Sequence, residues 1–339
     1  MTDASVPGSK IGVLLVNLGT PDATDFWSVR RYLKEFLSDP RVIEAPRWQW
    51  WPVLNLIVLT IRPGRSGKAY AAVWDKLGPG SPLRAATEGQ AKKLIAWVAN
   101  GGLGAARPIV EWAMRYGTPS IPDKLAKLTA AGCDRVLVFP LYPQYSATTT
   151  ATVCDAVFSE LEKMRLQPAL RTIPAYPTDP VYIAALAQSY RDFAASLNFT
   201  PDALLLSFHG LPQSYADKGD PYPVQCAATY QALAAALAND VKATHMSFQS
   251  RFGRAEWLKP YTSDRVRELA HNGCKNLVVM APGFVADCVE TLEELDMENQ
   301  HFFRKAGGEN YATVPCLNDS DEGMRVIYEL VARELKGWI

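Results

Sequence analysis

The sequence predicts an α/β protein made of two similar halves, each a four-stranded parallel sheet flanked by helices. Strand-like runs alternate with helix-like runs along the whole chain, which is the pattern of a parallel sheet covered by helices. The chain has 339 residues, which is more than one hydrophobic core usually supports, so two domains are expected. Several short segments also occur twice in the same order, which indicates an internal repeat.

Three segments of the first half recur in the second half. The pairs are LLVNLGTP (14–21) with LLLSFHGLP (204–212), MRYG (114–117) with SRFG (250–253), and AGCDRVLVFP (131–140) with NGCKNLVVMA (272–281). His209 is the one extra residue in the second copy of the first pair. The helices before the third pair are expected to begin at Asp123 and Asp264, because aspartate is a good helix N-cap.

These repeats place four strands in each half. The expected strands are 11–18, 108–114, 135–141 and 170–174, followed by 203–208, 245–249, 276–281 and 311–315. The segment 174–180 is the expected crossover between the halves. Residues 1–177 then form the first domain and residues 178–320 the second. The last helix, in 321–339, is expected to fold back onto the first domain.

Composition and missing motifs exclude several classes of protein. Lys plus Arg and Asp plus Glu number 35 each, and this balance argues against a general nucleic-acid binder. The six cysteines form no CxxC pair, so neither a zinc knuckle nor a redox pair is indicated. The N-terminus shows no secretory signal, so we expect a cytoplasmic protein. Neither half carries a glycine-rich phosphate loop after its first strand, which disfavours dinucleotide binding.

The segment 46–65 holds three tryptophans and a run of aliphatic residues between arginines. Its apolar part is too short to cross a bilayer, which requires about 20 residues. Tryptophan and arginine around a short apolar stretch suit a helix that lies in a membrane interface. A helix packed into the protein explains the same pattern, and the sequence leaves both interpretations open.

Ligands of open α/β sheets bind beyond the carboxyl ends of the strands, so the strand ends are the places to search for chemistry. His209 lies at the end of the buried run ALLLSFH. A histidine there is either a functional group or a ring satisfied by a backbone carbonyl at a turn. The other three histidines do not share this setting.

The second candidate region follows the strand that contains NLVVM. Glu290, Glu294 and Glu298 are spaced by four residues and therefore share one face of a helix. No Lys or Arg occurs in this segment, from 285 to 303, before Arg304. An acidic, solvated helix face is the simpler interpretation. A row of carboxylates without cations also suits a path that attracts and passes on a metal ion. Imidazole with one or two carboxylates is an incomplete set, which fits a metal that is delivered and released.

Five motifs together resemble the ferrochelatases, in particular those of Gram-negative bacteria. They are LLVNLGTP, YPQYSATTTATV, SFHGLPQSYADKGDPYPVQC, FQSRFGRAEWLKPYT and GFVADCVETLEELDMEN. The resemblance runs from about Gly12 to the C-terminal helix. It implies the chelatase fold of two Rossmann-like domains, and insertion of Fe²⁺ into protoporphyrin IX to form protohaem in haem biosynthesis.

The resemblance also implies roles for individual residues. The histidine of the family's SFHG motif falls on His209 and the first glutamate of its ETLEE motif on Glu290, as catalytic and metal-binding groups, with Glu294 as a further metal ligand. The substrate-binding positions fall on Arg62, Tyr70, Ser81, Arg115, Tyr116 and Trp257. The segment 46–65 becomes an apolar lip over the cleft, through which a peripheral membrane contact is expected.

Two departures from the family pattern limit what can be carried over. Some relatives have a histidine where this chain has Cys288, so no second histidine ligand is expected. Others bind a [2Fe-2S] cluster through cysteines near the C-terminus, and this chain ends ELKGWI, so we expect no cluster and no other cofactor. Two alternatives remain: a chelatase for another tetrapyrrole, such as coproporphyrin III, and a non-catalytic haem or metal carrier.

Overall fold

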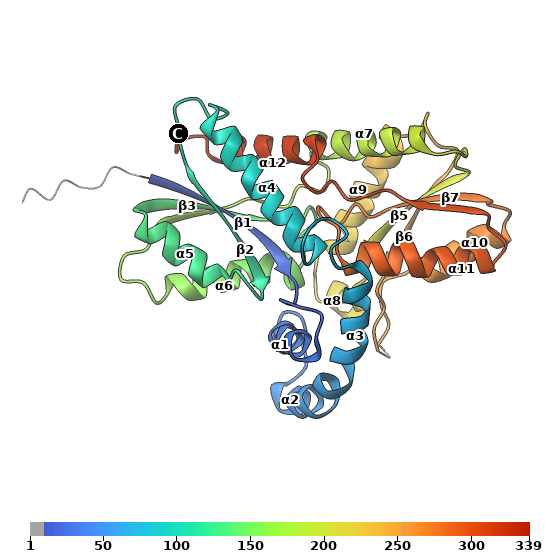
Figure 1. Ribbon diagram of the computed structural model, residues 1–339, viewed down its shortest axis with the longest axis horizontal. Coiled ribbons are helices and arrows are strands. Elements are labelled where there is room, and N and C mark those ends of the chain that lie inside the picture. Colours follow the sequence, from blue (N-terminus) through green and yellow to red (C-terminus); the bar gives the residue numbers. More distant parts are fainter. Residues whose placement is uncertain (1–9, 254) are drawn as a thin grey trace, which may run out of the picture.

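The computed structural model describes residues 10–253 and 255–339 (Figure 1). It contains two four-stranded sheets with the orders β2-β1-β3-β4 and β6-β5-β7-β8, and all neighbouring strands are parallel. The predicted fold class is therefore confirmed. The expected absence of a secretory signal concerns residues 1–9, which lie outside the described residues.

The observed strands agree with the expected ones to within a few residues at each end. They are β1 (Lys10–Gly19), β2 (Ile109–Tyr116), β3 (Cys133–Pro140), β4 (Ala169–Thr172), β5 (Ala203–His209), β6 (Thr244–Gln249), β7 (Asn276–Met280) and β8 (Asn310–Thr313). The repeated segments occupy corresponding strands, because β1, β2 and β3 take the same places in the first sheet as β5, β6 and β7 in the second. The internal repeat is thus a repeat of topology.

Helices surround both sheets. Those of the first half are α1 (Phe26–Leu37), α2 (Arg47–Val53), α3 (Leu59–Val73), α4 (Pro82–Ala99), α5 (Ile121–Ala130) and α6 (Thr152–Leu161). Those that follow are α7 (Pro180–Ser196), α8 (Gln213–Asp217), α9 (Tyr222–Ala236), α10 (Thr262–His271), α11 (Asn299–Lys305) and α12 (Asp321–Glu334). In the described part of the chain no helix is long and apolar enough to cross a membrane.

The expected helix caps at Asp123 and Asp264 are wrong. Helix α5 begins after Ser120, whose Oγ accepts the N–H of Asp123 at 3.3 Å, and α10 begins after Tyr261 without a side-chain cap. Both aspartates lie in the first turn instead. Their negative charge there still interacts favourably with the positive end of the helix dipole.

Three π-helical segments interrupt or precede regular helices. They are η1 (Leu54–Val58), η2 (Ala147–Ala151) and η3 (Glu290–Glu298). Segments η2 and η3 each follow the third strand of their half, so they occupy corresponding places in the repeat. Such i→i+5 segments are rare and often occur at functional sites. All three fall in motifs that the sequence marks as candidates for function.

The two sheets share a hydrophobic core. One continuous buried cluster includes Leu15 and Phe139 of the first sheet together with Leu206 and Val278 of the second. Gln144 adds a polar connection, because its buried Nε2 donates to the Thr229 hydroxyl at 2.9 Å and to the Pro282 carbonyl at 3.2 Å. The two halves are therefore packed together as one body.

The C-terminal helix contacts both halves. Helix α12 lies beside α4 and α7 (Figure 1). Beyond it, the Arg171 guanidinium stacks on the Trp338 ring at 4.2 Å and donates to the Glu334 carbonyl at 2.8 Å. Arg171 belongs to β4, so the end of the chain is held against the first sheet.

Helices α1, α2 and α3 project from the middle of one long side of the molecule, and α2, η1 and the start of α3 contain the segment 46–65 (Figure 1). Leu54 and Leu59 are fully buried against the first domain. Trp48, Leu56 and Ile61 are 76, 73 and 71 % exposed. One face of the segment therefore packs into the protein, as the second interpretation expects, and the other is an exposed apolar surface; contact of this surface with a membrane stays a prediction.

Replacing Gln144 by Ala should lower the free energy of unfolding by about 2 to 4 kcal/mol, because a buried cavity forms and the Thr229 and Pro282 bonds are lost. Urea denaturation followed by circular dichroism measures this. Gln188→Ala removes a bond from an exposed glutamine of α7 to Asp192 and should change stability by less than about 0.5 kcal/mol. Equal stability of the two variants would contradict the role of Gln144.

Candidate functional site

The candidate site lies at the carboxyl ends of β5, β6 and β7. His209 is the last residue of β5 and its ring is half-buried. Its Nδ1 lies 2.6 Å from the Gly210 carbonyl oxygen. A carbonyl only accepts, so Nδ1 carries the proton and Nε2 keeps its lone pair. The sequence left a satisfied histidine and a functional one as alternatives; one ring nitrogen is satisfied by a backbone carbonyl, and the functional role of the other nitrogen stays a prediction.

Gly210 makes this turn possible. Its N–H donates to the Gln249 carbonyl at 2.8 Å, and a side chain at this position would collide with the same carbonyl and approach the Trp257 ring. Only glycine permits such a close approach of the two chains. The end of β5, and with it the backbone of His209, is thereby fixed against the end of β6.

Gln249 connects the strand ends to the acidic helix. This side chain is 3 % exposed, its Oε1 accepts from the Ser207 hydroxyl at 2.8 Å, and its Nε2 donates to the Glu290 carbonyl at 2.9 Å. Gln249 also pairs with His209 across β5 and β6. Glu290 is therefore held at the strand end that carries His209. Gln249 was not among the residues predicted from the sequence, although a polar residue at the end of a buried strand is a usable signal.

The first turn before η3 is anchored by Asp287. This carboxylate is 3 % exposed; it accepts from the Thr291 hydroxyl at 2.8 Å and from Asn318 Nδ2 at 2.7 Å. The Asn318 amide oxygen in turn accepts the Asp287 N–H at 2.8 Å. Asp287 is thus a structural anchor that fixes where the acidic helix begins, and its charge does not add to the open carboxylate row.

The row of glutamates runs from the surface inward. Glu298 is exposed, whereas Glu294 and Glu290 are half-buried. Burial raises the pKa of Glu294 to about 7, hydrogen bonds from Ser250 oppose this shift, and the charges of Glu290 and Glu298 add to it. Burial also raises the pKa of Glu293. Near neutral pH, Glu294 therefore exchanges readily between the protonated and the charged form.

The expected metal ligands His209, Glu290 and Glu294 do not form a complete metal-binding site. Among the described residues, no group of three or more His, Cys, Asp or Glu side chains is arranged to hold a metal ion. Glu294 has both carboxylate oxygens occupied, by the N–H and the hydroxyl of Ser250, each at 2.6 Å. Gln249 therefore links the backbone of Glu290 to the strand end that carries His209, whereas the Glu294 carboxylate is engaged by Ser250.

Helix α3 forms the facing wall. Burial raises the pKa of the Tyr70 hydroxyl, and the negative charge of Glu290 raises it further. Burial lowers the pKa of the Arg62 guanidinium, and the charge of Glu290 opposes this. Arg62 also stacks on the Phe252 ring at 4.3 Å. Two of the expected substrate-binding residues, Arg62 and Tyr70, thus lie within electrostatic reach of Glu290.

Ser81 and Trp257 border the same region. Ser81 is buried at the start of α4, and Leu83 in the first turn of this helix packs against Cys288, close to Glu290. Trp257 pairs with Pro212 just beyond His209, and its buried indole N–H has no hydrogen-bond partner among the described residues. A buried donor without a partner is uncommon and is available to a ligand.

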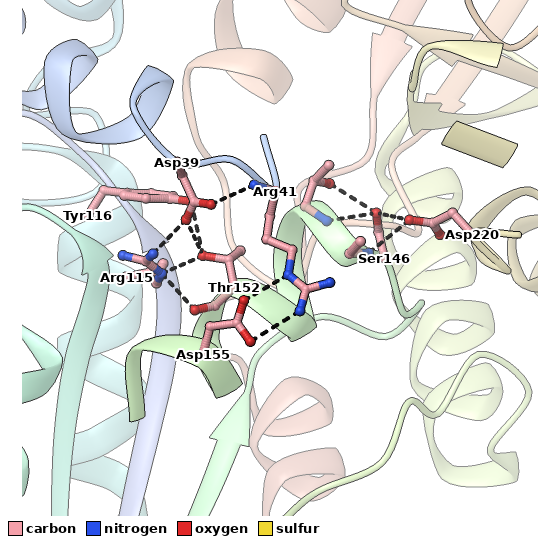
Figure 2. A network of polar contacts seen from close by, with 10 residues as sticks. Asp39, Arg41, Arg115, Tyr116, Ser146, Thr152, Asp155 and Asp220 are labelled. Carbon is pink, nitrogen blue, oxygen red and sulfur yellow. Dashed lines mark hydrogen bonds and ion pairs between the residues drawn. The ribbon is translucent and has the colours of Figure 1, made fainter. Parts of the chain in front are cut away.

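Arg115 and Tyr116 belong to a separate polar network (Figure 2). Asp39 accepts from Arg115 at 2.5 Å, from the Tyr116 hydroxyl at 2.8 Å and from the Thr152 hydroxyl at 2.8 Å. Tyr116 is 0 % exposed, so it presents no surface to a substrate here. The network ties the chain before the lip to β2 and α6, and its bonds between distant parts of the chain were not visible in the sequence.

The family model for ferrochelatase matches residues 10–335. The chain belongs to the ferrochelatase family. Ferrochelatases of Chelativorans sp. (strain BNC1) and Nitrobacter hamburgensis are 54 and 53 % identical to it, over 99 % of this chain and 94 and 96 % of theirs. That of Methylocella silvestris is 52 % identical over 97 % of this chain and 95 % of its own. As a ferrochelatase family member, the chain is a lyase that inserts metal into a porphyrin.

Solved structures confirm the chelatase fold of this ferrochelatase family member. SirB from Bacillus subtilis with Fe³⁺ has a TM-score of 0.54 and 12 % identity, and the match covers 97 % of each chain. The Deinococcus radiodurans protein DR2241, described as similar to chelatases, has a TM-score of 0.53 and 13 % identity over 95 % of this chain and 55 % of its own. At this identity the comparison concerns the fold alone.

Replacing Glu294 by Gln should remove a pH dependence of stability. The pKa of about 7 in the folded protein lies above the ordinary value, so the contribution of this carboxyl is present at low pH and is lost as the pH rises from about 4.5 to 7. On going from pH 5 to pH 8, the free energy of unfolding of the variant should therefore rise by up to about 3 kcal/mol relative to that of the wild type. Urea denaturation at both pH values measures this gain.

Glu298→Gln, at the exposed end of the same helix, is the matched control. It should follow the wild type within about 0.5 kcal/mol at both pH values. Parallel behaviour of Glu294→Gln and wild type would contradict the environment assigned to Glu294.

Proposed function

We propose that this chain inserts Fe²⁺ into protoporphyrin IX with release of two protons, which forms protohaem in the terminal step of haem biosynthesis. One observation carries the proposal: an imidazole with a free Nε2 and a helix of carboxylates are joined through Gln249 at one edge of a sheet. Arg62 and Tyr70 lie on the opposite wall. This combination suits exchange of a metal for protons.

The proposed chemistry needs a base and a metal-holding group. A free-base porphyrin loses two pyrrole N–H protons as the metal enters from one face. Its nitrogens lie in the ring plane, so a cleft that bends the ring exposes them, at a cost of a few kcal/mol. His209 accepts a pyrrole proton at Nε2, the nitrogen that its bond to Gly210 leaves free. Glu290 holds the metal or takes the second proton.

The carboxylate row supplies the metal. Glu298 is exposed, and Glu294 and Glu290 lie deeper, so a cation meets successive negative charges on its way inward. Carboxylates bind hard divalent metals, and imidazole suits borderline metals such as Fe²⁺. An incomplete ligand set binds the ion weakly enough to release it into the ring. The proposal includes no resident cofactor and no [2Fe-2S] cluster.

The walls favour a porphyrin with few carboxylates. The lip presents Trp48, Leu56 and Ile61, and Arg62 and Ser81 are the proposed anchors for propionate groups. A sirohydrochlorin-type ring with eight carboxylates requires many more cations. Trp257, with its unpartnered indole N–H, is proposed to border the ring. Coproporphyrin III is the nearest alternative substrate.

Anaerobic mixing of the purified protein with Fe²⁺ and an excess of free-base porphyrin tests the proposal. Loss of the free-base absorbance over many turnovers is expected with protoporphyrin IX. Conversion of one equivalent at most would indicate a carrier. Faster turnover of coproporphyrin III than of protoporphyrin IX would show that the proposed substrate is wrong and that the proposed reaction, insertion of Fe²⁺, is right.

We further propose that the protein works in the cytoplasm and contacts the inner face of the membrane peripherally through 46–65. The exposed tryptophan and aliphatic side chains of this segment support the contact, since tryptophan favours the membrane interface. Between 45 and 74 the chain has four Lys or Arg residues and no Asp or Glu, which favours anionic lipid heads. A role in nucleic-acid binding is not part of the proposal.

Replacing His209 by Ala should lower turnover by at least about 100-fold, because general-base catalysis contributes this much or more. Porphyrin affinity, measured by quenching of tryptophan fluorescence, should remain within about three-fold of the wild-type value, because His209 is proposed to accept a proton and not to hold the ring. Glu290→Gln should also lose most of its turnover. His271→Ala, on the exposed end of α10, is the control and should retain activity. Normal turnover of His209→Ala would refute the assignment.

Replacing Trp48, Leu56 and Ile61 together by Ser should weaken binding to phospholipid vesicles at least ten-fold in a flotation assay. Each substitution removes apolar side-chain area that would otherwise be buried in the membrane interface. Leu166→Ser with Val224→Ser is the matched control, since these side chains are 88 and 72 % exposed outside the lip. Equal binding of the two variants would exclude the lip as the contact surface.

A further inference from the structure

Ser250 has an unusual backbone and an unusual partner. It follows directly after β6 and has a φ of 66°, a left-handed conformation that costs a residue with a side chain roughly 1 kcal/mol or more. In this conformation its N–H donates to Glu294 Oε1 and its hydroxyl to Oε2, each at 2.6 Å. Two hydrogen bonds to a charged group offset such a backbone cost.

These two bonds occupy the Glu294 carboxylate. Each oxygen receives one donor from Ser250, so a metal ion that binds both oxygens must displace at least one of them. Hydrogen bonds to charged groups are worth more than ordinary ones, so they compete with a cation. Binding of a cation at Glu294 and the bonds to Ser250 therefore exclude each other at least in part.

The same loop reaches across to the lip. Phe252 lies two residues after Ser250 and is 50 % exposed, and its ring is stacked by Arg62 of α3 at 4.3 Å. The stacked pair joins the second half of the protein to the helix that forms the facing wall. Phe252 is thus only two residues from the backbone that the Ser250–Glu294 bonds hold.

The repeat shows that this turn is not imposed by the fold. The Met114 N–H donates to the Pro119 carbonyl at 2.7 Å just as the Phe248 N–H donates to the Pro260 carbonyl at 2.8 Å, so Met114 matches Phe248 and Ser250 matches Tyr116. Tyr116 is the buried last residue of β2, whereas β6 ends at Gln249, one residue before Ser250. Ser250 has a positive φ and Tyr116 does not. The left-handed turn and its bond to a carboxylate thus belong to the half that carries His209.

We propose that Ser250 is a positioning residue that couples metal passage to the opening of the cleft. A metal ion arriving at Glu294 takes the carboxylate from Ser250; the loop then relaxes and the Phe252–Arg62 stack separates. Departure of the metal toward Glu290 returns the carboxylate to Ser250 and closes the stack. This inference rests on the proposed function, because it assumes that Glu294 lies on the metal path.

Steady-state kinetics of Ser250→Ala test the competition. The loss of the hydroxyl should lower KM for Fe²⁺ at least five-fold and leave KM for protoporphyrin IX within two-fold. Ser250→Gly, which tolerates the left-handed backbone, should shift KM for Fe²⁺ in the same direction. Ser120→Ala removes a hydroxyl–carboxylate bond of 2.7 Å to Asp123 on α5 and should change neither constant. An unchanged or raised KM for Fe²⁺ in both Ser250 variants would overturn the proposal.

Hydrogen exchange tests the coupling without turnover. Zn²⁺ added to the porphyrin-free protein should speed amide exchange at least three-fold in peptides covering 249–253, because the Ser250 N–H loses its acceptor. The effect should vanish in Glu294→Gln. Unchanged or slower exchange in wild type would overturn the coupling. If Zn²⁺ speeds the exchange but the protein does not insert iron, the proposed function fails and the coupling stands. If the protein inserts iron normally but Zn²⁺ does not speed the exchange, only the coupling is refuted.

Discussion

A buried amide, Gln249, links the strand end that carries His209 to the start of the acidic helix. Its Oε1 is fixed by Ser207 on the neighbouring strand and its Nε2 by the carbonyl of Glu290. Because the amide is buried, each unmade bond costs a desolvation penalty with no water to replace it. The strand end that carries His209 and the first turn of the acidic helix therefore keep one relative position. Asp287 secures the same turn from its other side.

The duplicated fold explains why the chemistry is confined to one half. Both sheets have the same strand order, and both third strands lead into a π-helical segment. In the first half this segment is ATTTA, with Asp39 and Thr152 engaged in the network around Arg115. In the second half it is ETLEELDME, whose carboxylates stay partly open. One half thus supports the lip, and the other carries the residues to which we assign metal and proton transfer in the proposed function.

The strand positions and the placement of His209 and Glu290 at strand ends could be predicted, because hydrophobic runs and repeats are local signals. The cap of α5 could not, since Ser120, three residues before the expected Asp123, caps the helix by accepting the Asp123 N–H. The burial of Tyr116 depends on Asp39, 77 positions away. The left-handed turn at Ser250 depends in the same way on Glu294. Such long-range partners leave no local pattern in one sequence.

The central claim is that His209 and Glu290 address the same ring centre from a shared cleft. A crystal structure of the protein with an unreactive metalloporphyrin bound tests it directly. We expect the tetrapyrrole centre between His209 Nε2 and the Glu290 carboxylate, with each group within about 5 Å of the metal, close enough for a direct or water-bridged contact. A ring bound outside this cleft, or one that only a single group of the pair reaches, would contradict the account.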